Sequence, residues 1–223
     1  MNMQPSVIFD LDGVITDTAH YHYLAWKALA DSIGAPFDAE ANEALKGIDR
    51  MASLRWIAAR SARDFSEAEL AILAERKNAH YQRLIADMAP EDAFPGVPEL
   101  LLALRRKGCR IGLASVSKNA AFVLDKLRLT ELFDYVADAA SIVRTKPDPE
   151  IFLTVAAALG TPPAACVGIE DAAAGVEAIL AARMPAIGVG SSEILGRANL
   201  VVAHTREITP EMIFALAASV AEG

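Results

Sequence analysis

The chain has 223 residues, 53% of them hydrophobic, and a formal net charge of −8. A chain of this length can bury a sizeable core, as one large domain or two smaller ones. The acidic balance without a basic patch argues against nucleic acid as a partner. No stretch reaches the roughly 18 uncharged apolar residues that a membrane-spanning helix requires.

The chain begins without a basic region or a signal-peptide core. Its cysteines, Cys109 and Cys166, lie in or beside apolar strand patterns and predict buried thiols. Such thiols are typical of a reducing compartment. We therefore expect a cytoplasmic protein. We also expect no membrane partner, and a monomer.

The first predicted element is a short buried strand, Val7–Phe9, which ends in Asp10 and Asp12 and is followed by Gly13. Apolar residues bounded by a turn signal fit a parallel sheet, and ligands gather at the carboxyl ends of its strands. Paired carboxylates there suit a metal site, or a nucleophile with an acid/base partner. Taken alone, the motif fits an ordinary acidic turn equally well.

The next part of the chain, residues 19 to 90, shows no strand pattern and predicts helices separated by Gly34, by Gly47 and by the helix start at Ser66. The predicted helices are Tyr21–Ile33, Ala39–Leu45, Ala52–Ser61 and Ser66–Ile85. An all-helical insertion after the first strand predicts a helical cap domain at residues 18–90. The core domain would then consist of residues 1–17 and 91–223.

From Val97 onwards, predicted helices and strands alternate, which is typical of an α/β fold with a doubly wound parallel sheet. The predicted helices are Val97–Lys107, Asn119–Leu127, Pro149–Leu159, Ala172–Ala182 and a last one that begins at Pro210. The predicted strands are Arg110–Ala114, Tyr135–Ala137, Cys166–Ile169, Ala186–Val189 and Leu200–Val202.

Three further motifs follow in this region. Ser115 ends an apolar run, Lys146 precedes a proline turn, and Glu170 and Asp171 end another apolar run. Each has an ordinary explanation by itself: a strand end, a solvated lysine, an acidic loop before a helix. All of them in this order, after Asp10 and its neighbours, resemble the haloacid dehalogenase superfamily of phosphotransferases.

The resemblance implies a role for each of these residues. Asp10 would attack phosphorus and form an aspartyl-phosphate, since a carboxylate needs no deprotonation at neutral pH. Asp12 would act as acid and base on a sugar hydroxyl. Lys146 and Ser115 would stabilise the transferring phosphoryl group. The implied ligands of a Mg²⁺ ion are Asp10, Glu170, Asp171 and the main-chain carbonyl of Asp12.

Within the superfamily, the chain resembles the beta-phosphoglucomutases in the stretches Thr16–His22, Leu45–Arg50, Arg76–Asn78 and Ala114–Asn119. These enzymes interconvert beta-D-glucose 1-phosphate and 6-phosphate through the 1,6-bisphosphate. The resemblance implies that the phosphate not being transferred is held by Arg50, Ser117, Lys118 and Asn119. It also implies a specificity loop at Lys46 and Gly47, support of Asp12 by His22 and Lys77, and a hinge at Thr18.

A mutase needs a second cationic phosphate site, and Arg50 with Lys118 would provide it, whereas a phosphatase needs one site only. The alternatives are a Mg²⁺-dependent sugar-phosphate phosphatase on the same scaffold, and a catalytically idle binding protein. Asp49 departs from the family pattern, where serine is expected, and its carboxylate either weakens the distal phosphate site or orients Arg50.

Overall fold

The structure, a computed structural model, describes residues 4–45 and 48–221. The chain divides into two compact units. Residues 1–17 and 89–223 form what we term the core unit, and residues 18–88 form the helical unit. Within the described ranges, no helix is both long enough and apolar enough to cross a membrane.

The core unit is built on a parallel sheet, so the predicted α/β fold is confirmed. Its strands are β1 (Ser6–Phe9), β2 (Ile111–Leu113), β3 (Tyr135–Val136), β4 (Cys166–Glu170), β5 (Ala186–Val189) and β6 (Leu200–Val202). They lie in the order β3-β2-β1-β4-β5-β6. The chain therefore moves outward from β1 to β3 and starts again at β4 on the other side of β1. Ligands bind at such a switch point, beyond the carboxyl ends of the strands.

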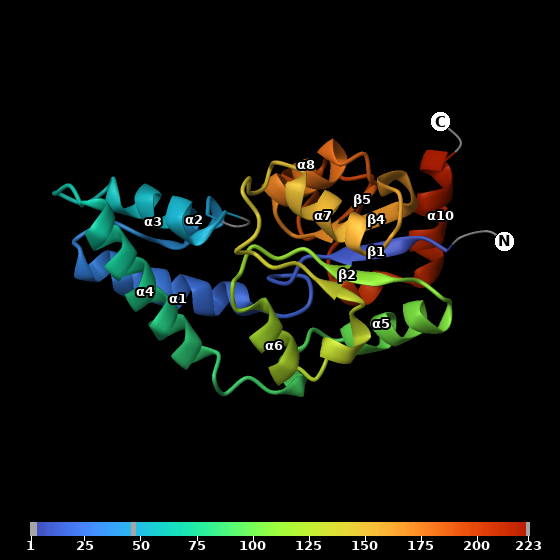
Figure 1. Ribbon diagram of the computed structural model, residues 1–223, viewed down its shortest axis with the longest axis horizontal. Coiled ribbons are helices and arrows are strands. Elements are labelled where there is room, and N and C mark those ends of the chain that lie inside the picture. The colour runs from blue at the N-terminus through green and yellow to red at the C-terminus, as the bar shows by residue number, and fades with distance from the viewer. Residues whose placement is uncertain (1–3, 46–47, 222–223) are drawn as a thin grey trace. The chain divides into compact units, whose positions relative to one another are not determined.

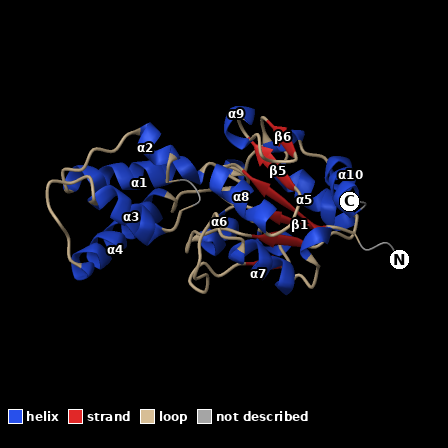
Figure 2. Ribbon diagram, turned by 90° about the horizontal axis from the view of Figure 1, so that it is seen from above, coloured by secondary structure: helices blue, strands red, loops and turns tan. Residues whose placement is uncertain are grey.

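Helices cover both faces of this sheet (Figures 1 and 2). They are α5 (Val97–Arg106), α6 (Ala120–Lys126), α7 (Glu150–Ala158), α8 (Ala173–Ala181), α9 (Ser192–Leu195) and α10 (Pro210–Ala221). On one face, Ile8 of β1, Phe152 of α7 and Ile179 of α8 share a buried cluster, while α5 and α10 lie on the opposite face. The sequence patterns do not predict α9, because four residues are too few to show a helical period.

The helical unit contains the four predicted helices in its described residues. They are α1 (Thr18–Ser32), α2 (Ala39–Glu43), α3 (Arg50–Ala58) and α4 (Glu67–Leu84), shown in blue to green in Figure 1. Trp26, Leu54 and Leu70 are buried in an apolar core, against which Trp56 packs. This unit therefore has a hydrophobic core of its own.

The start of α3 differs from the prediction. The helix begins at Arg50 rather than at Ala52, because Asp49 is its N-cap. The Asp49 carboxylate accepts hydrogen bonds from the backbone amides of Met51 at 2.8 Å and Ala52 at 3.1 Å. Aspartate is among the best N-cap residues, since it satisfies amides that have no partner within the helix. Asp49 stands where the family pattern has serine, and it caps the helix.

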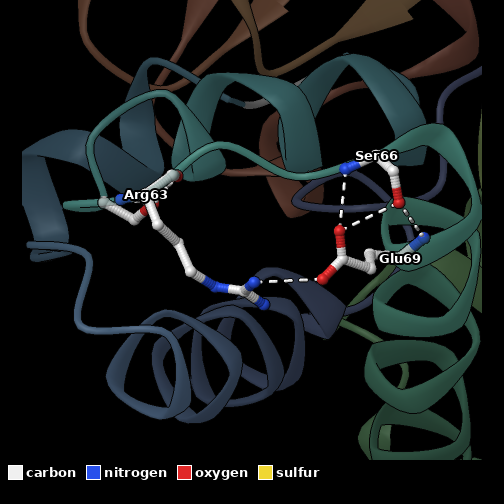
Figure 3. A network of polar contacts seen from close by, with 4 residues as sticks. Arg63, Ser66 and Glu69 are labelled. Carbon is white, nitrogen blue, oxygen red and sulfur yellow. Dashed lines mark hydrogen bonds and ion pairs between the residues drawn. The ribbon is translucent and has the colours of Figure 1, made fainter.

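The start of α4 is fixed by a reciprocal cap (Figure 3). The Ser66 hydroxyl accepts a hydrogen bond from the Glu69 amide, and the Glu69 carboxylate accepts one from the Ser66 amide at 2.9 Å. Arg63 pairs with the same carboxylate at 3.0 Å. The hydrogen bonds from Ser66, and then the hydrogen bond from Arg63, lower the pKa of Glu69 below its usual value. A capping box of this kind defines where a helix begins.

Candidate active site

Three carboxylates converge where two neighbouring strands end. Asp10 follows β1, Glu170 is the last residue of β4, and Asp171 comes next. β1 and β4 pair in parallel, which brings these distant parts of the chain side by side. One oxygen of each carboxylate lies within 4.8 Å of the others. The structure thus brings together the three acidic side chains that the resemblance implies as metal ligands.

Lys146 lies among these acids. Its Nζ donates to Asp10 Oδ1 at 2.6 Å and to Glu170 Oε1 at 3.1 Å, and its side chain is fully buried. Burial by itself would lower the pKa of Lys146, but the charges of Asp10 and Glu170 raise it above its ordinary value. The lysine is therefore a fixed positive charge that holds one oxygen of Asp10 in place.

The cluster still has an excess of negative charge, because three carboxylates share one ammonium group. Burial, and then the charge of Asp10, raises the pKa of Glu170 above its usual range. Carboxylate oxygens are hard ligands of the kind that Mg²⁺ and Ca²⁺ prefer. A divalent cation bound by these oxygens would balance the excess, so the residues present fit a metal site.

Two glycines make room for the acids. Gly13 has a φ of +84°, in the left-handed region that favours glycine, and a Cβ there would lie 2.2 Å from Asp171 Oδ2. A Cβ at Gly175 would lie 1.6 Å from Glu170 Oε1. The Asp171 amide in turn donates to Glu170 Oε2 at 2.8 Å. The carboxylates therefore fill spaces that any side chain at these two positions would occupy.

Asp12 lies on the loop after β1, next to Gly13, and is half-buried. The loop is closed by the pairing of Asp12 with Thr16, and by the Thr16 hydroxyl, which donates to the Asp92 carbonyl at 2.6 Å. The carboxylate is thus on a short, anchored turn beside Asp10. This arrangement suits a proton-transferring group near a nucleophile.

A serine-rich turn follows β2. The Ser115 hydroxyl accepts from the Ser117 amide at 3.1 Å, and the Ser117 hydroxyl accepts from the Asn119 amide at 3.3 Å. These three side chains are buried, whereas Lys118 is exposed. The turn therefore orders polar groups at the carboxyl end of a strand beside β1, where an anionic ligand would find donors.

In the helical unit, Lys77 Nζ lies 2.7 Å from His22 Nδ1 and 4.4 Å from the centre of the Trp26 ring. Burial, followed by the charges of Lys77 and Arg50, holds the pKa of His22 well below its usual value. His22 is therefore neutral, and Nδ1 accepts from the ammonium group, so its proton is assigned to Nε2. The sequence patterns do not show that this histidine and lysine form a pair.

Arg50 is held by two residues of α4. Its Nη2 donates to Asn78 Oδ1 at 2.9 Å, and its Nη1 lies 3.6 Å from Glu75 Oε1. Asn78 belongs to a stretch that resembles the beta-phosphoglucomutases, Arg76–Asn78, whereas Glu75 lies just outside it. The sequence contains one indication that Glu75 and Asn78 contact the same partner: they are three residues apart in a helix and therefore lie on the same face.

Thr18, the implied hinge residue, is buried at the first position of α1. Lys46 and Gly47, the implied specificity loop, lie outside the described residues.

The profile of the haloacid dehalogenase-like hydrolases matches residues 5–183. The chain belongs to this family. It is 47% identical to the beta-phosphoglucomutase of Bacillus subtilis over 210 residues, which are 93% of both chains. A crystal structure of beta-phosphoglucomutase from Clostridium difficile matches with a TM-score of 0.95 and 45% identity, covering 99% of this chain and all of the other.

Phosphatases of the same family are related at lower identity. The fructose-1-phosphate phosphatase of Escherichia coli is 33% identical over 186 residues, 82% of this chain and 95% of the relative. A phosphatase of phosphorylated carbohydrates from Thermotoga maritima is 30% identical over 211 residues, 93% of this chain and 95% of the relative. The resemblance to the mutases is therefore stronger than the resemblance to these phosphatases.

Proposed function

We propose that this enzyme is an isomerase that interconverts beta-D-glucose 1-phosphate and beta-D-glucose 6-phosphate through beta-D-glucose 1,6-bisphosphate. The observation that carries the proposal is the 47% identity to a beta-phosphoglucomutase over 93% of both chains. The convergence of Asp10, Lys146, Glu170 and Asp171 at one edge of the sheet supports it. The enzyme would take part in carbohydrate metabolism and pass through a phosphorylated state.

The proposed metal is Mg²⁺, with Asp10, Glu170, Asp171 and the main-chain carbonyl of Asp12 as its protein ligands. A bound divalent cation supplies positive charge that reduces the repulsion between a carboxylate and a phosphate dianion. The choice of Mg²⁺ rests on the oxygen-only donor set and on the phosphate substrate, since Mg²⁺ prefers oxygen ligands and commonly binds phosphate oxygens of a substrate as well.

The proposed cycle starts with Asp10 phosphorylated. The 6-hydroxyl of beta-glucose 1-phosphate attacks this phosphorus, the bond from phosphorus to the Asp10 oxygen breaks, the hydroxyl proton passes to Asp12, and the 1,6-bisphosphate forms. After the bisphosphate has turned round, the freed Asp10 carboxylate attacks the phosphorus at C1. The bond from that phosphorus to the sugar oxygen breaks, Asp12 returns its proton to this oxygen, and glucose 6-phosphate leaves with Asp10 phosphorylated again. Lys146 holds the Asp10 carboxylate throughout, and Ser115 donates a hydrogen bond to an oxygen of the transferring group.

The remaining residues are proposed to serve the second phosphate and the position of Asp12. Arg50 would bind the phosphate that is not being transferred, with Ser117, Lys118 and Asn119. His22 and Lys77 would support Asp12, with Thr18 as a hinge and Lys46 and Gly47 as the specificity loop. A neutral His22 suits this role, because its Nε2–H can donate to a carboxylate.

We also propose that the enzyme acts in the cytoplasm. Both cysteines are free and buried, and burial raises the pKa of Cys166 to about 12. Free thiols of this kind are usual in proteins of a reducing compartment.

One experiment separates the mutase from the phosphatase. Conversion of beta-glucose 1-phosphate to the 6-phosphate and release of inorganic phosphate are measured side by side, with a trace of the bisphosphate present. We expect isomerisation to be faster. If inorganic phosphate is released faster than the 6-phosphate is formed, the protein is a sugar-phosphate phosphatase rather than a mutase. If neither reaction occurs, it is a binding protein.

A variant pair tests the second phosphate site. Arg50→Ala should reduce isomerisation far more than it reduces aspartyl-phosphate formation from a small phosphoryl donor, because a small donor has no distal phosphate. Arg55→Ala is the control, since Arg55 belongs to the same helix and makes an exposed ion pair with Glu67 at 2.7 Å. Equal losses in both reactions for Arg50→Ala would contradict the assigned role.

A further inference from the structure

The guanidinium group of Arg50 already has acceptors at both of its terminal nitrogens. Nη2 donates to Asn78 Oδ1 at 2.9 Å, and Nη1 lies 3.6 Å from Glu75 Oε1. A phosphate bound in the usual bidentate manner uses the same pair of guanidinium nitrogens or an adjacent pair. Each of these nitrogens carries a second N–H, and Nε carries one, so a phosphate can find free donors on Arg50. A phosphate bound there would lie close to the Glu75 carboxylate, and the repulsion between like charges favours loss of the Glu75 contact.

The two contacts differ in strength. The Arg50–Asn78 distance is that of a normal hydrogen bond, and Asn78 is half-buried. The Arg50–Glu75 distance exceeds a hydrogen bond, and the Glu75 side chain is 76% exposed. An exposed ion pair is only weakly stabilising, so the Glu75 contact is the one that gives way.

Charge explains why an acid is present beside Arg50. The Arg50 side chain is only 18% exposed. Burial lowers the pKa of Arg50, and the Glu75 carboxylate opposes that effect. Arg50 and Lys77 both act electrostatically on His22, so positive charge is concentrated in this part of the helical unit. Glu75 partly neutralises it when no phosphate is bound.

We propose that Glu75 competes with the distal phosphate of the substrate for Arg50, and that Asn78 is a positioning residue that keeps the guanidinium group oriented for that phosphate. The proposal rests on the role of Arg50 in the proposed function. It assigns a function to Glu75 that the motif comparison does not include. The two residues affect substrate affinity with opposite signs: Glu75 weakens it and Asn78 strengthens it.

The test compares KM and kcat for beta-glucose 1-phosphate in three variants of the full chain. Glu75→Gln should lower the KM by about twofold to fivefold, the range that an exposed ion pair allows, with kcat within a factor of two. Asn78→Ala should raise the KM by about fivefold, the effect of one hydrogen bond. Glu67→Gln is the control, because it breaks the exposed Arg55–Glu67 pair near the start of the same helix, and it should leave both constants unchanged.

Salt supplies a second readout that a merely structural role would not show. Raising the ionic strength screens exposed charges, so the KM advantage of Glu75→Gln should shrink towards one, while the effect of Asn78→Ala should persist. An unchanged or higher KM for Glu75→Gln at low salt would overturn the competition. An unchanged KM for Asn78→Ala in a variant with native circular dichroism would overturn the positioning role.

Failure of this inference differs from failure of the proposed function. If the wild type isomerises the sugar but Glu75→Gln has no effect, the role of Arg50 stands and that of Glu75 falls. If the wild type does not isomerise the sugar at all, the proposed function itself is wrong. Direct calorimetric titration of glucose 1,6-bisphosphate into each variant then shows whether Glu75 affects bisphosphate binding, and equal affinities in Glu75→Gln and wild type would refute the competition.

Discussion

Replacing Gly13 by alanine tests the proposed metal site without removing any of its proposed ligands. The added Cβ would lie 2.2 Å from Asp171 Oδ2 and 2.5 Å from its Cγ. To restore an ordinary contact of 3.4 Å, the oxygen must move by about 1.2 Å. Metal–ligand distances tolerate a change of only about 0.2 Å. Asp171 would therefore leave the proposed coordination sphere, even though its carboxylate is still present.

The substitution also has a backbone cost, which a matched variant isolates. Gly13 has a φ of +84° and Gly34 has a φ of +68°, but a Cβ at Gly34 would meet no atom within 4 Å. Both alanine variants should lose about 1–2 kcal/mol of unfolding free energy, because an L-residue is strained in the left-handed region. Only Gly13→Ala should in addition weaken Mg²⁺ binding, by about tenfold or more, the usual effect of disturbing a ligand's surroundings.

The affinity for Mg²⁺ is measured by calorimetric titration of each metal-free variant. The Mg²⁺ concentration that isomerisation requires is measured for the same variants. Urea unfolding of both variants reports the backbone cost separately. A Gly13→Ala protein that binds Mg²⁺ as tightly as the Gly34→Ala protein would refute the reasoning, because it would show that Asp171 either does not move or does not bind the ion.

Three further outcomes are expected. Asp10→Asn should abolish phosphoryl transfer while leaving the fold intact, since an amide cannot form the acyl-phosphate; near-wild-type turnover in protein free of other phosphatases would contradict this. Lys146→Met should lower the unfolding free energy of the metal-free protein by about 3–5 kcal/mol, because it leaves the buried Asp10 and Glu170 carboxylates without their cation. Urea unfolding measures this loss. A loss below about 1 kcal/mol would show that Lys146 is not needed to stabilise the two buried carboxylates. Ser66→Ala should cost about 1 kcal/mol through loss of the N-cap of α4, visible as a lower melting temperature with kcat unchanged.

The sequence predicts the core sheet well because its strands are short apolar runs with turn signals at both ends. The convergence of Asp10 with Glu170 also follows from residue patterns alone, since each carboxylate comes at the end of a strand and parallel strands end at one edge of the sheet. Lys146 lies on a turn, outside any strand pattern. Its contact with Asp10 spans 136 positions of sequence, so only the family resemblance placed it near the acids.

Side-chain pairing within the helical unit was harder to predict. The contact of His22 with Lys77 and that of Arg50 with Glu75 depend on how α1, α3 and α4 pack together. Helical periodicity predicts which face of a helix is buried, but it does not predict which residues of two helices meet. The start of α3 could have been predicted, because an aspartate directly before a helical run is an N-cap signal in its own right.

The two units contain different intrinsic spectroscopic and chemical probes. Both tryptophans, Trp26 and Trp56, belong to the helical unit, and both cysteines, Cys109 and Cys166, belong to the core unit. Tryptophan fluorescence therefore reports the opening of the helical unit alone, and the reaction of the buried thiols with a labelling reagent reports the opening of the core unit alone. The order in which the two units unfold is thus measurable on the unmodified protein, without adding a dye or a mutation.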